Sequence, residues 1–205
     1  MSRHPLETYL THLYEIHQTG GGTPGESFYG AFETLVNHVG ARLKPKVRCV
    51  PQLKNTGAGE PDFGLYTASQ FERVQDDQPA GTLPERGVIE VKGWGDDTLV
   101  TTRAEQVSKY WRKYGLVLVT NYRDFVLVGR DDQGKPVRLE AYRLAESKKG
   151  FLGLMAQPPA RYASGRAPDR SGRPGLVPGF LRPRGSRPCR TGRRPACPRR
   201  SQEGA

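Results

Sequence analysis

Apolar residues follow two spacings along the chain, one typical of helices and the other typical of strands. Apolar positions three or four residues apart predict helices over 6–17, over 101–114 and over a segment that begins near Glu26 and ends at Gly40. Short alternating or continuous apolar runs predict strands. These runs are 47–53, 62–67, 87–92, 115–120, 125–129 and 137–144.

The order of these elements indicates the fold class. After the helix at 6–17, and without the additional strand at 137–144, the elements up to about residue 155 run helix, three strands, helix and two strands. This order is typical of one α/β domain. The run 115–120 is apolar at nearly every position, so we expect a sheet that is covered on both faces. Pro51 predicts that its strand lies at an edge or carries a bulge, because proline cannot donate a ladder hydrogen bond.

Residues 156–205 differ in composition from residues 1–155. They are dominated by Arg, Pro, Gly, Ala and Ser, and they contain no Lys, Ile or Asn. Such a segment cannot bury enough apolar surface to offset the entropy of ordering, so it predicts a disordered basic tail. A sharper hypothesis is that the segment is an out-of-frame translation of a G+C-rich gene, which the coding DNA would decide.

The net charge of +11 is distributed unevenly. Residues 156–205 carry 12 Arg against two acidic residues, whereas residues 1–155 carry 20 basic and 19 acidic residues. The overall charge therefore says little about the first segment. A nucleic-acid-binding face there has to come from the local arrangement of charges.

The cysteines and the apolar runs indicate the compartment. Cys49, Cys189 and Cys197 are too few and too scattered for a disulfide framework, which predicts a reducing, cytoplasmic location. No apolar run approaches the roughly 18 residues of a membrane span. The first residues also lack the continuous apolar segment of a signal peptide. We therefore expect a soluble protein with no membrane partner.

The strand at 87–92 carries an acid and a base among apolar residues. Because side chains alternate in a strand, Ile89 and Val91 face one side while Glu90 and Lys92 face the other. The apolar pair can pack in the core, and the charged pair can then share a cleft with a neighbouring strand. The alternative is a solvated Glu–Lys pair on an exposed strand face.

Asp62 is the residue expected to complete this cleft, because it stands at the entrance of the strand most suited to lie beside Glu90. Two carboxylates of this kind suit a hard divalent cation such as Mg²⁺, and the carbonyl oxygen of Val91 is a further candidate ligand. Lys92 would then lie beside a water and orient it or help remove its proton. The cation would stabilise charge on a phosphate under attack.

The sequence Pro61-Asp62, followed by Glu90-x-Lys92, resembles the motif of the PD-(D/E)XK nuclease superfamily. The resemblance implies a restriction-endonuclease-like core of order α-β-β-β-α-β. Gln106 and Tyr110 lie on one face of their helix and resemble a Gln-x-x-x-Tyr element of some of these nucleases. There the Gln helps to hold the active site and the Tyr supports it or touches the nucleic acid. The alternative is a packed Tyr beside an ordinary surface Gln.

Glu26 is the candidate for a further acid, which superfamily members often supply from the first core helix. It lies at the start of the helix that ends at Gly40. The alternative is that Glu26 only caps this helix, paired with Thr23 in a capping box.

A closer resemblance is to the N-terminal nuclease region of the single-chain, Type ISP-like restriction–modification enzymes, and it covers about residues 5–150. It implies an endonuclease that cuts double-stranded DNA in phage defence and requires Mg²⁺, for which Mn²⁺ can substitute. In that family a helicase-like motor, an adenine N6-methyltransferase and a target-recognition domain follow the nuclease. The segments that carry the resemblance are 13–40, 57–67, 86–93 and 106–129.

The signatures of those later domains are missing from this sequence, which we therefore expect to be a truncated form. It contains no Asn-Pro-Pro-Tyr or Asp-Pro-Pro-Tyr, and "TGGGTPG" is not followed by the Gly-Lys-Ser/Thr of a phosphate-binding loop. We expect no methylation, translocation or sequence-specific cleavage from this chain alone. Two other hypotheses stay open: a catalytically silent fragment, and a non-specific nucleic-acid-binding protein dominated by the arginine-rich segment.

Overall fold

The computed structural model describes residues 4–22, 25–72, 82–98, 102 and 104–158. The expected disordered tail, 156–205, lies outside the described residues except for residues 156–158, and the expected cap Thr23 also lies outside them. Within them, the helices are α1 (Pro5–Gln18), η1 (a 3₁₀ helix, Glu26–Phe28), α2 (Tyr29–Gly40), α3 (Ala68–Glu72), α5 (Glu105–Tyr114) and α6 (Lys148–Ala156). The strands are β1 (Val47–Pro51), β2 (Phe63–Thr67), β3 (Val88–Val91), β4 (Val117–Thr120), β5 (Asp124–Arg130) and β6 (Pro136–Arg143).

The described strands form one six-stranded sheet in chain order, from β1 at one edge to β6 at the other. Strands β3 and β4 run parallel, and each of the other neighbouring pairs is antiparallel. The parallel pair needs a crossover, and α5 lies in that connection. The edge position of β1 confirms the expectation from Pro51. The predicted mixed α/β fold class is therefore confirmed.

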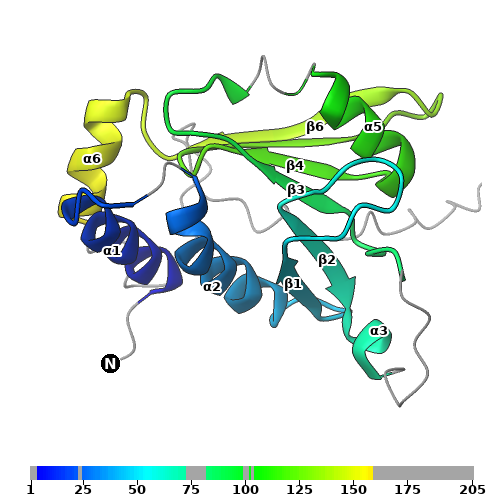
Figure 1. Cartoon of the computed structure of the whole chain (residues 1–205), viewed down its shortest axis with the longest axis horizontal. Helices are drawn as coiled ribbons and strands as arrows, with labels where there is room; N and C mark the ends of the chain where they lie inside the picture. The colour runs from blue at the N-terminus through cyan, green and yellow to red at the C-terminus, as the bar shows by residue number, and fades with distance from the viewer. Residues whose placement is uncertain (1–3, 23–24, 73–81, 99–101, 103, 159–205) are drawn as a thin grey trace, which may run out of the picture.

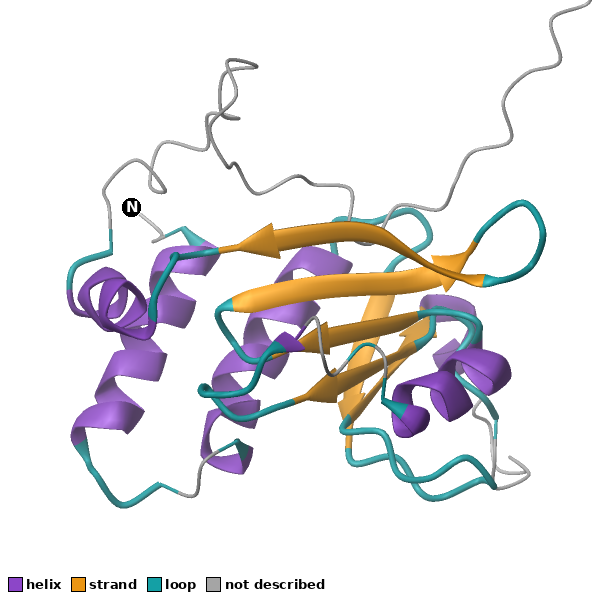
Figure 2. Cartoon of the chain, turned by 90° about the horizontal axis from the view of Figure 1, so that it is seen from above, coloured by secondary structure: helices purple, strands orange, loops and turns teal. Residues whose placement is uncertain are grey.

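Helices cover the two faces of the sheet unequally. Figures 1 and 2 show α1, α2 and α6 together on one side and α5 on the other. Two buried apolar clusters correspond to these two sides. The larger combines residues of α1, α2 and α6 with sheet residues that include Phe63, Ile89 and Val91. The smaller combines Val88 and residues of β4 and β5 with residues of α5.

Two helix boundaries and one whole helix differ from the sequence-based expectation. Helix α5, within the expected helix 101–114, begins only at Glu105, with Ala104 as its N-cap. The segment at Glu26 first forms a 3₁₀ turn, and the α-helix begins at Tyr29. Helix α6 was not expected, and its residues Phe151 and Met155 are buried in the larger cluster.

Among the described residues, no helix combines the length and the apolar character that crossing a membrane would require.

Gly87, which leads into β3, cannot be replaced without strain. Its φ of +94° is unfavourable for residues with a side chain, and a Cβ atom there would collide with the carbonyl oxygen of Leu116. We expect Gly87→Ala to lower the free energy of unfolding by about 3 kcal/mol in urea denaturation. The control is Gly134→Ala, with φ of +76° and open space around it, which should cost about 1 kcal/mol. Equal losses would show that the approach to Leu116 contributes nothing.

Candidate active site at the ends of β2 and β3

The pairing of β2 with β3 brings the two predicted carboxylates to one place. Phe63 lies opposite Ile89 in the antiparallel register, so Asp62, the residue before β2, lies beside the carboxyl-terminal end of β3. There the backbone N–H of Val91 donates a hydrogen bond of 2.6 Å to Oδ2 of Asp62. The negative charge of Asp62 also acts on Glu90 and works to raise its pKa. The structure thus brings Asp62 and Glu90 together at one end of the strand pair.

Glu90 is the most unusual residue of this group, because it is a carboxylate that is only 3% exposed. Its oxygen Oε1 accepts a hydrogen bond of 2.6 Å from Nζ of Lys92. Its oxygen Oε2 is buried, and among the described residues it has no hydrogen-bond partner. Buried polar atoms are nearly always paired, so the unpaired carboxylate oxygen calls for a partner such as a water or a cation.

Burial governs the protonation of Glu90. Desolvation raises its pKa, the hydrogen bond from Lys92 lowers it, and the charge of Asp62 raises it further. The pKa of Glu90 is thereby raised to about 7. The carboxyl therefore exchanges its proton near neutral pH, and a cation that binds it there displaces that proton.

Lys92 stands between this buried carboxylate and the solvent. Its side chain is 28% exposed, whereas that of Glu90 is 4% exposed. The backbone N–H of Lys92 donates to the carbonyl oxygen of Thr120 at 2.7 Å, which continues the pairing of β3 with β4. The ammonium can therefore contact Glu90 and a solvent molecule from a fixed backbone position.

The carbonyl oxygen of Val91 faces the same edge as Asp62. The N–H groups of Val88 and Lys92 donate toward β4, so the backbone groups of Val91, an odd number of residues away, point to the β2 side. The bond from its N–H to Asp62 agrees with this direction. The predicted ligand set of Asp62, Glu90 and the Val91 carbonyl is therefore compatible with the backbone geometry.

Tyr29 is part of this site and was not found from the sequence. It is the first residue of α2, and its hydroxyl donates a hydrogen bond to Oδ1 of Asp62. Burial and this hydrogen bond raise the pKa of Tyr29 far above its usual value, with smaller contributions from the charges of Asp62, Glu26 and Glu90. The phenol thus stays a hydrogen-bond donor at any physiological pH.

Gln106 and Tyr110 form the pair expected from their spacing on α5. Nε2 of Gln106, an exposed residue, donates to the hydroxyl of the fully buried Tyr110 at 2.9 Å. Desolvation raises the pKa of Tyr110 to about 12, against the hydrogen bond from Gln106 and together with the charges of Glu90 and Asp62. Tyr110 therefore senses both carboxylates from the α5 side. The catalytic roles expected for the pair stay predictions.

Glu26 lies at the rim of the site. It is exposed at the start of η1, and its charge works to raise the pKa values of Tyr29 and Tyr122. Among the described residues, no three His, Cys, Asp or Glu side chains are grouped so as to hold a metal ion. The structure therefore does not join Glu26 to Asp62 and Glu90 in one cluster, and its catalytic role stays a prediction.

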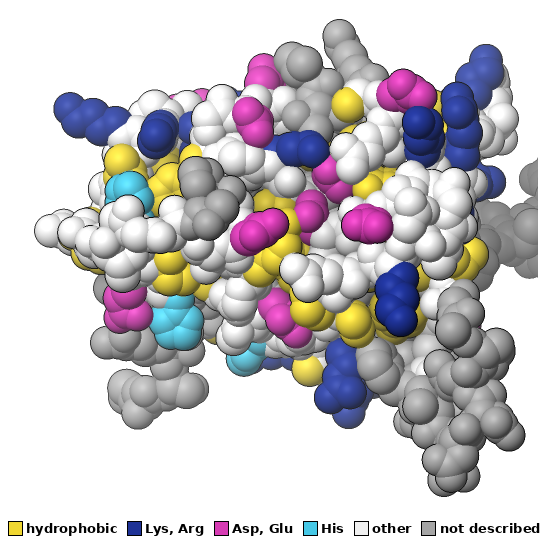
Figure 3. All heavy atoms as spheres, viewed as in Figure 1, with side chains coloured by type: hydrophobic (Ala, Val, Ile, Leu, Met, Phe, Trp, Pro, Cys, Tyr) yellow, Lys and Arg dark blue, Asp and Glu magenta, His cyan; other side chains and the backbone are white. Residues whose placement is uncertain are grey.

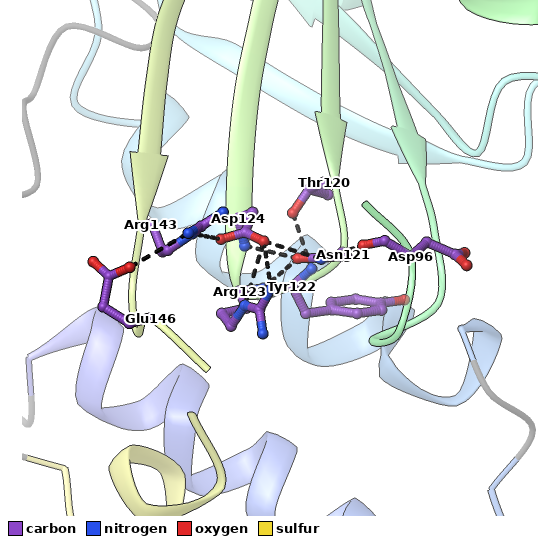
Figure 4. Close-up of polar contacts among 8 residues, drawn as sticks. All are labelled: Asp96, Thr120, Asn121, Tyr122, Arg123, Asp124, Arg143 and Glu146. Carbon is purple, nitrogen blue, oxygen red and sulfur yellow. Dashed lines mark hydrogen bonds and ion pairs between the residues drawn. The ribbon is translucent and has the colours of Figure 1, made fainter. Parts of the chain in front are cut away.

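A polar network holds the turn between β4 and β5 next to the loop that follows Lys92 (Figure 4). Asn121 donates to the carbonyl oxygen of Asp96 at 2.9 Å and thereby ties the loop to the turn. Desolvation works to raise the pKa of Asp124, but hydrogen bonds from Arg123 and Arg143 outweigh it and hold the pKa below its usual value. The ion pair with Asp124 holds the Arg123 side chain at the turn.

The face of the molecule shown in Figure 3 is not uniformly basic. In the face shown in Figure 3, acidic side chains gather near the middle among apolar and uncharged atoms, and most Lys and Arg side chains lie toward the margins. This agrees with the nearly balanced charge of residues 1–155. A nucleic acid that approached this face would meet negative charge near its centre.

Comparisons with known proteins found little. No protein-family model and no curated protein matches the chain. Among solved structures, it is similar to a chain of the cryo-EM structure of the DrdV–DNA complex, with 18% sequence identity and a TM-score of 0.49. The match covers 75% of this chain and 96% of that one. At this degree of similarity it says nothing about what this site does.

The raised pKa of Glu90 makes the stability of the cation-free protein depend on pH. The folded state holds the Glu90 proton up to about pH 7, whereas the pKa of a Glu exposed to water is 4.5. The free energy of unfolding should therefore lose a contribution as pH rises between these values. We expect Glu90→Gln to gain roughly 2 to 3 kcal/mol relative to the wild type across this range and nothing further above it.

Urea denaturation in the presence of a chelator, from pH 4 to pH 8, measures this difference. Glu140→Gln, which removes an exposed acid on the edge strand β6, is the control and should run parallel to the wild type. A constant difference between Glu90→Gln and the wild type across the whole range would show that Glu90 ionises normally.

Proposed function

We propose that this chain is a metal-dependent endodeoxyribonuclease domain of the restriction class, which hydrolyses phosphodiester bonds in double-stranded DNA. The observation that carries the proposal is the buried, unpaired Oε2 of Glu90. It lies in a carboxylate that also holds Lys92 and feels the charge of Asp62. Two carboxylates and one ammonium at the ends of adjacent strands are the groups that this reaction requires.

The residues present fit a small, hard cation such as Mg²⁺. Asp62, Glu90 and the Val91 carbonyl would supply oxygen ligands, and waters would complete the coordination, as is usual for Mg²⁺ in proteins. The cation, when bound, would supply the positive charge that stabilises the phosphate as negative charge develops on it. Mn²⁺ prefers the same class of oxygen ligands and is expected to substitute.

The chain's own residues would perform the remaining tasks. Lys92 can donate a hydrogen bond to a water on its exposed side while its other protons contact Glu90, and it can thereby orient that water toward phosphorus. Gln106 supports the site through Tyr110, which closes the α5 side. Glu26, at the rim, is a weaker candidate for a further acid in contact with the same water.

The choice of DNA and of the restriction class rests on the sequence resemblance to Type ISP-like enzymes and not on the comparisons. In that class the motor, methyltransferase and target-recognition domains would deliver and select the DNA. A domain without them is expected to cut slowly and without sequence preference.

The activity test is the conversion of supercoiled plasmid DNA to nicked and linear forms in Mg²⁺ or Mn²⁺. Lys92→Ala and Asp62→Asn should each lower the rate about a hundredfold or more, because each removes a group that acts on the reacting atoms. The matched control is Lys109→Ala, which removes an exposed lysine that forms an ion pair with the surface residue Glu105 on α5. It should retain the full rate.

The arginine-rich segment needs a separate control. A chain that ends at residue 158 keeps all of α6 and should retain the metal-dependent cleavage. Undiminished cleavage by both site variants would contradict the proposal. Binding that depends on residues 159–205 and falls steeply with salt, without cleavage, would instead favour a non-specific nucleic-acid-binding protein.

A further inference from the structure

Both oxygens of the Asp62 carboxylate are held by donors from different parts of the fold. The N–H of Val91 in β3 donates to Oδ2 at 2.6 Å, and the hydroxyl of Tyr29 at the start of α2 donates to Oδ1. Asp62 itself is half-buried and stands just outside β2, so the strand ladder alone does not fix its side chain. Without the hydroxyl, the carboxylate would have one donor and freedom to turn about its side-chain bonds.

The ring of Tyr29 is fixed independently of this hydrogen bond. It packs against Phe63, with ring centroids 4.9 Å apart and planes tilted by 56°. Phe63 is fully buried and is the first residue of β2, directly after Asp62. The same contact therefore places the phenol and the carboxylate relative to each other, and the hydroxyl can be removed without emptying the space that the ring fills.

The start of the helix is also held in place from a distance. The hydroxyl of Tyr122 donates to the carbonyl oxygen of Gly25, directly before η1. Tyr122 has φ of +70°, an unfavourable conformation for a residue with a side chain, and is fully buried. Its ring packs edge-on against Phe28, with centroids 5.4 Å apart, and Tyr9 donates to its carbonyl oxygen at 3.0 Å. Tyr122 thus holds Gly25 in place while in a strained conformation, close to the helix start from which Tyr29 reaches Asp62.

We propose that Tyr29 is a positioning residue for the cation site, whose hydroxyl orients the Asp62 carboxylate so that its remaining lone pairs face the bound ion. This inference rests on the proposed function, because it assumes that Asp62 is a ligand. Hydrogen bonds to ligating carboxylates generally govern affinity, and their loss weakens binding about 10- to 100-fold. The hydroxyl would act through Asp62 without touching the substrate.

The test is calorimetric titration of Mn²⁺ and Mg²⁺ into the full chain without DNA. We compare the wild type, Tyr29→Phe, Asp62→Asn and the control Tyr14→Phe, which removes a tyrosine hydroxyl from α1 away from the site. Tyr29→Phe should bind the cation about 10- to 100-fold more weakly, Asp62→Asn should lose measurable binding, and Tyr14→Phe should match the wild type. The thermal midpoint of Tyr29→Phe without cation should stay close to that of the wild type.

Cleavage kinetics add a second readout. If the hydroxyl acts through cation affinity, Tyr29→Phe should need a higher cation concentration for half-maximal rate, and saturating cation should restore most of the wild-type rate. A residue that only supports the fold would show a loss that saturating cation does not restore.

The outcomes separate the two proposals. A wild-type chain that binds no divalent cation contradicts the proposed function itself. A wild-type chain that binds, together with a Tyr29→Phe variant of equal affinity, overturns the role of Tyr29 and leaves the proposed function intact. A Tyr29→Phe variant that does not fold assigns the hydroxyl to stability and also overturns the positioning role.

Discussion

The burial of the Glu90 carboxylate is the constraint on which the site depends. Moving a charged group out of water without full pairing costs folding free energy, and Lys92 pairs only one of its two oxygens. The fold can tolerate this either because Glu90 takes up a proton near neutral pH or because a cation completes its partners. Val88 faces the same side of β3 and is packed in the smaller apolar cluster, as is expected of a residue that contributes only to packing. Stability and chemistry therefore make opposite demands at position 90.

The alternation of a strand was enough to group Glu90 with Lys92, and the structure also brings Asp62 next to β3, while the catalytic roles of the three residues stay predictions. The same reasoning could not find Tyr29. The apolar residues of its helix predict the buried face, but the contact with Asp62 joins residues 33 positions apart. That contact depends on where the start of α2 lies relative to β2. The hydrogen bond from Tyr122 to Gly25 helps to fix this position, and a local sequence pattern does not reveal it. The sequence held one weak signal for this contact, namely that Tyr29 places a hydroxyl-bearing ring beside Phe28 at the first turn of the helix.

The differences in the fold have a similar origin. Helix α6 contains Gly150 and Gly153, which weaken its intrinsic helix propensity, and it forms where Phe151 and Met155 can pack against the larger cluster. Its stability thus comes from tertiary contacts that propensity cannot reveal. Strand β4, by contrast, was predictable as a strand covered on both faces, because Leu118 packs into one cluster and Val117 and Val119 into the other. Local sequence patterns therefore predicted an element such as β4, whose own residues show that both of its faces are buried, but they did not predict α6.

Under the proposed function, the charges at the site would join a cation and Lys92 in one mechanism. Two carboxylates and one ammonium leave a negative excess when both acids are ionised, and a phosphodiester that approaches adds to the repulsion. Glu90 can give up its short ion pair with Lys92 only where another positive charge replaces it, because an unpaired buried carboxylate is costly. Glu90 and Asp62 would hold a cation whose charge offsets this excess, and Lys92, which is partly exposed, could then donate to a water more readily. The pairing of Glu90 with Lys92 would thus keep the lysine engaged until the positive charge that the phosphate requires is in place.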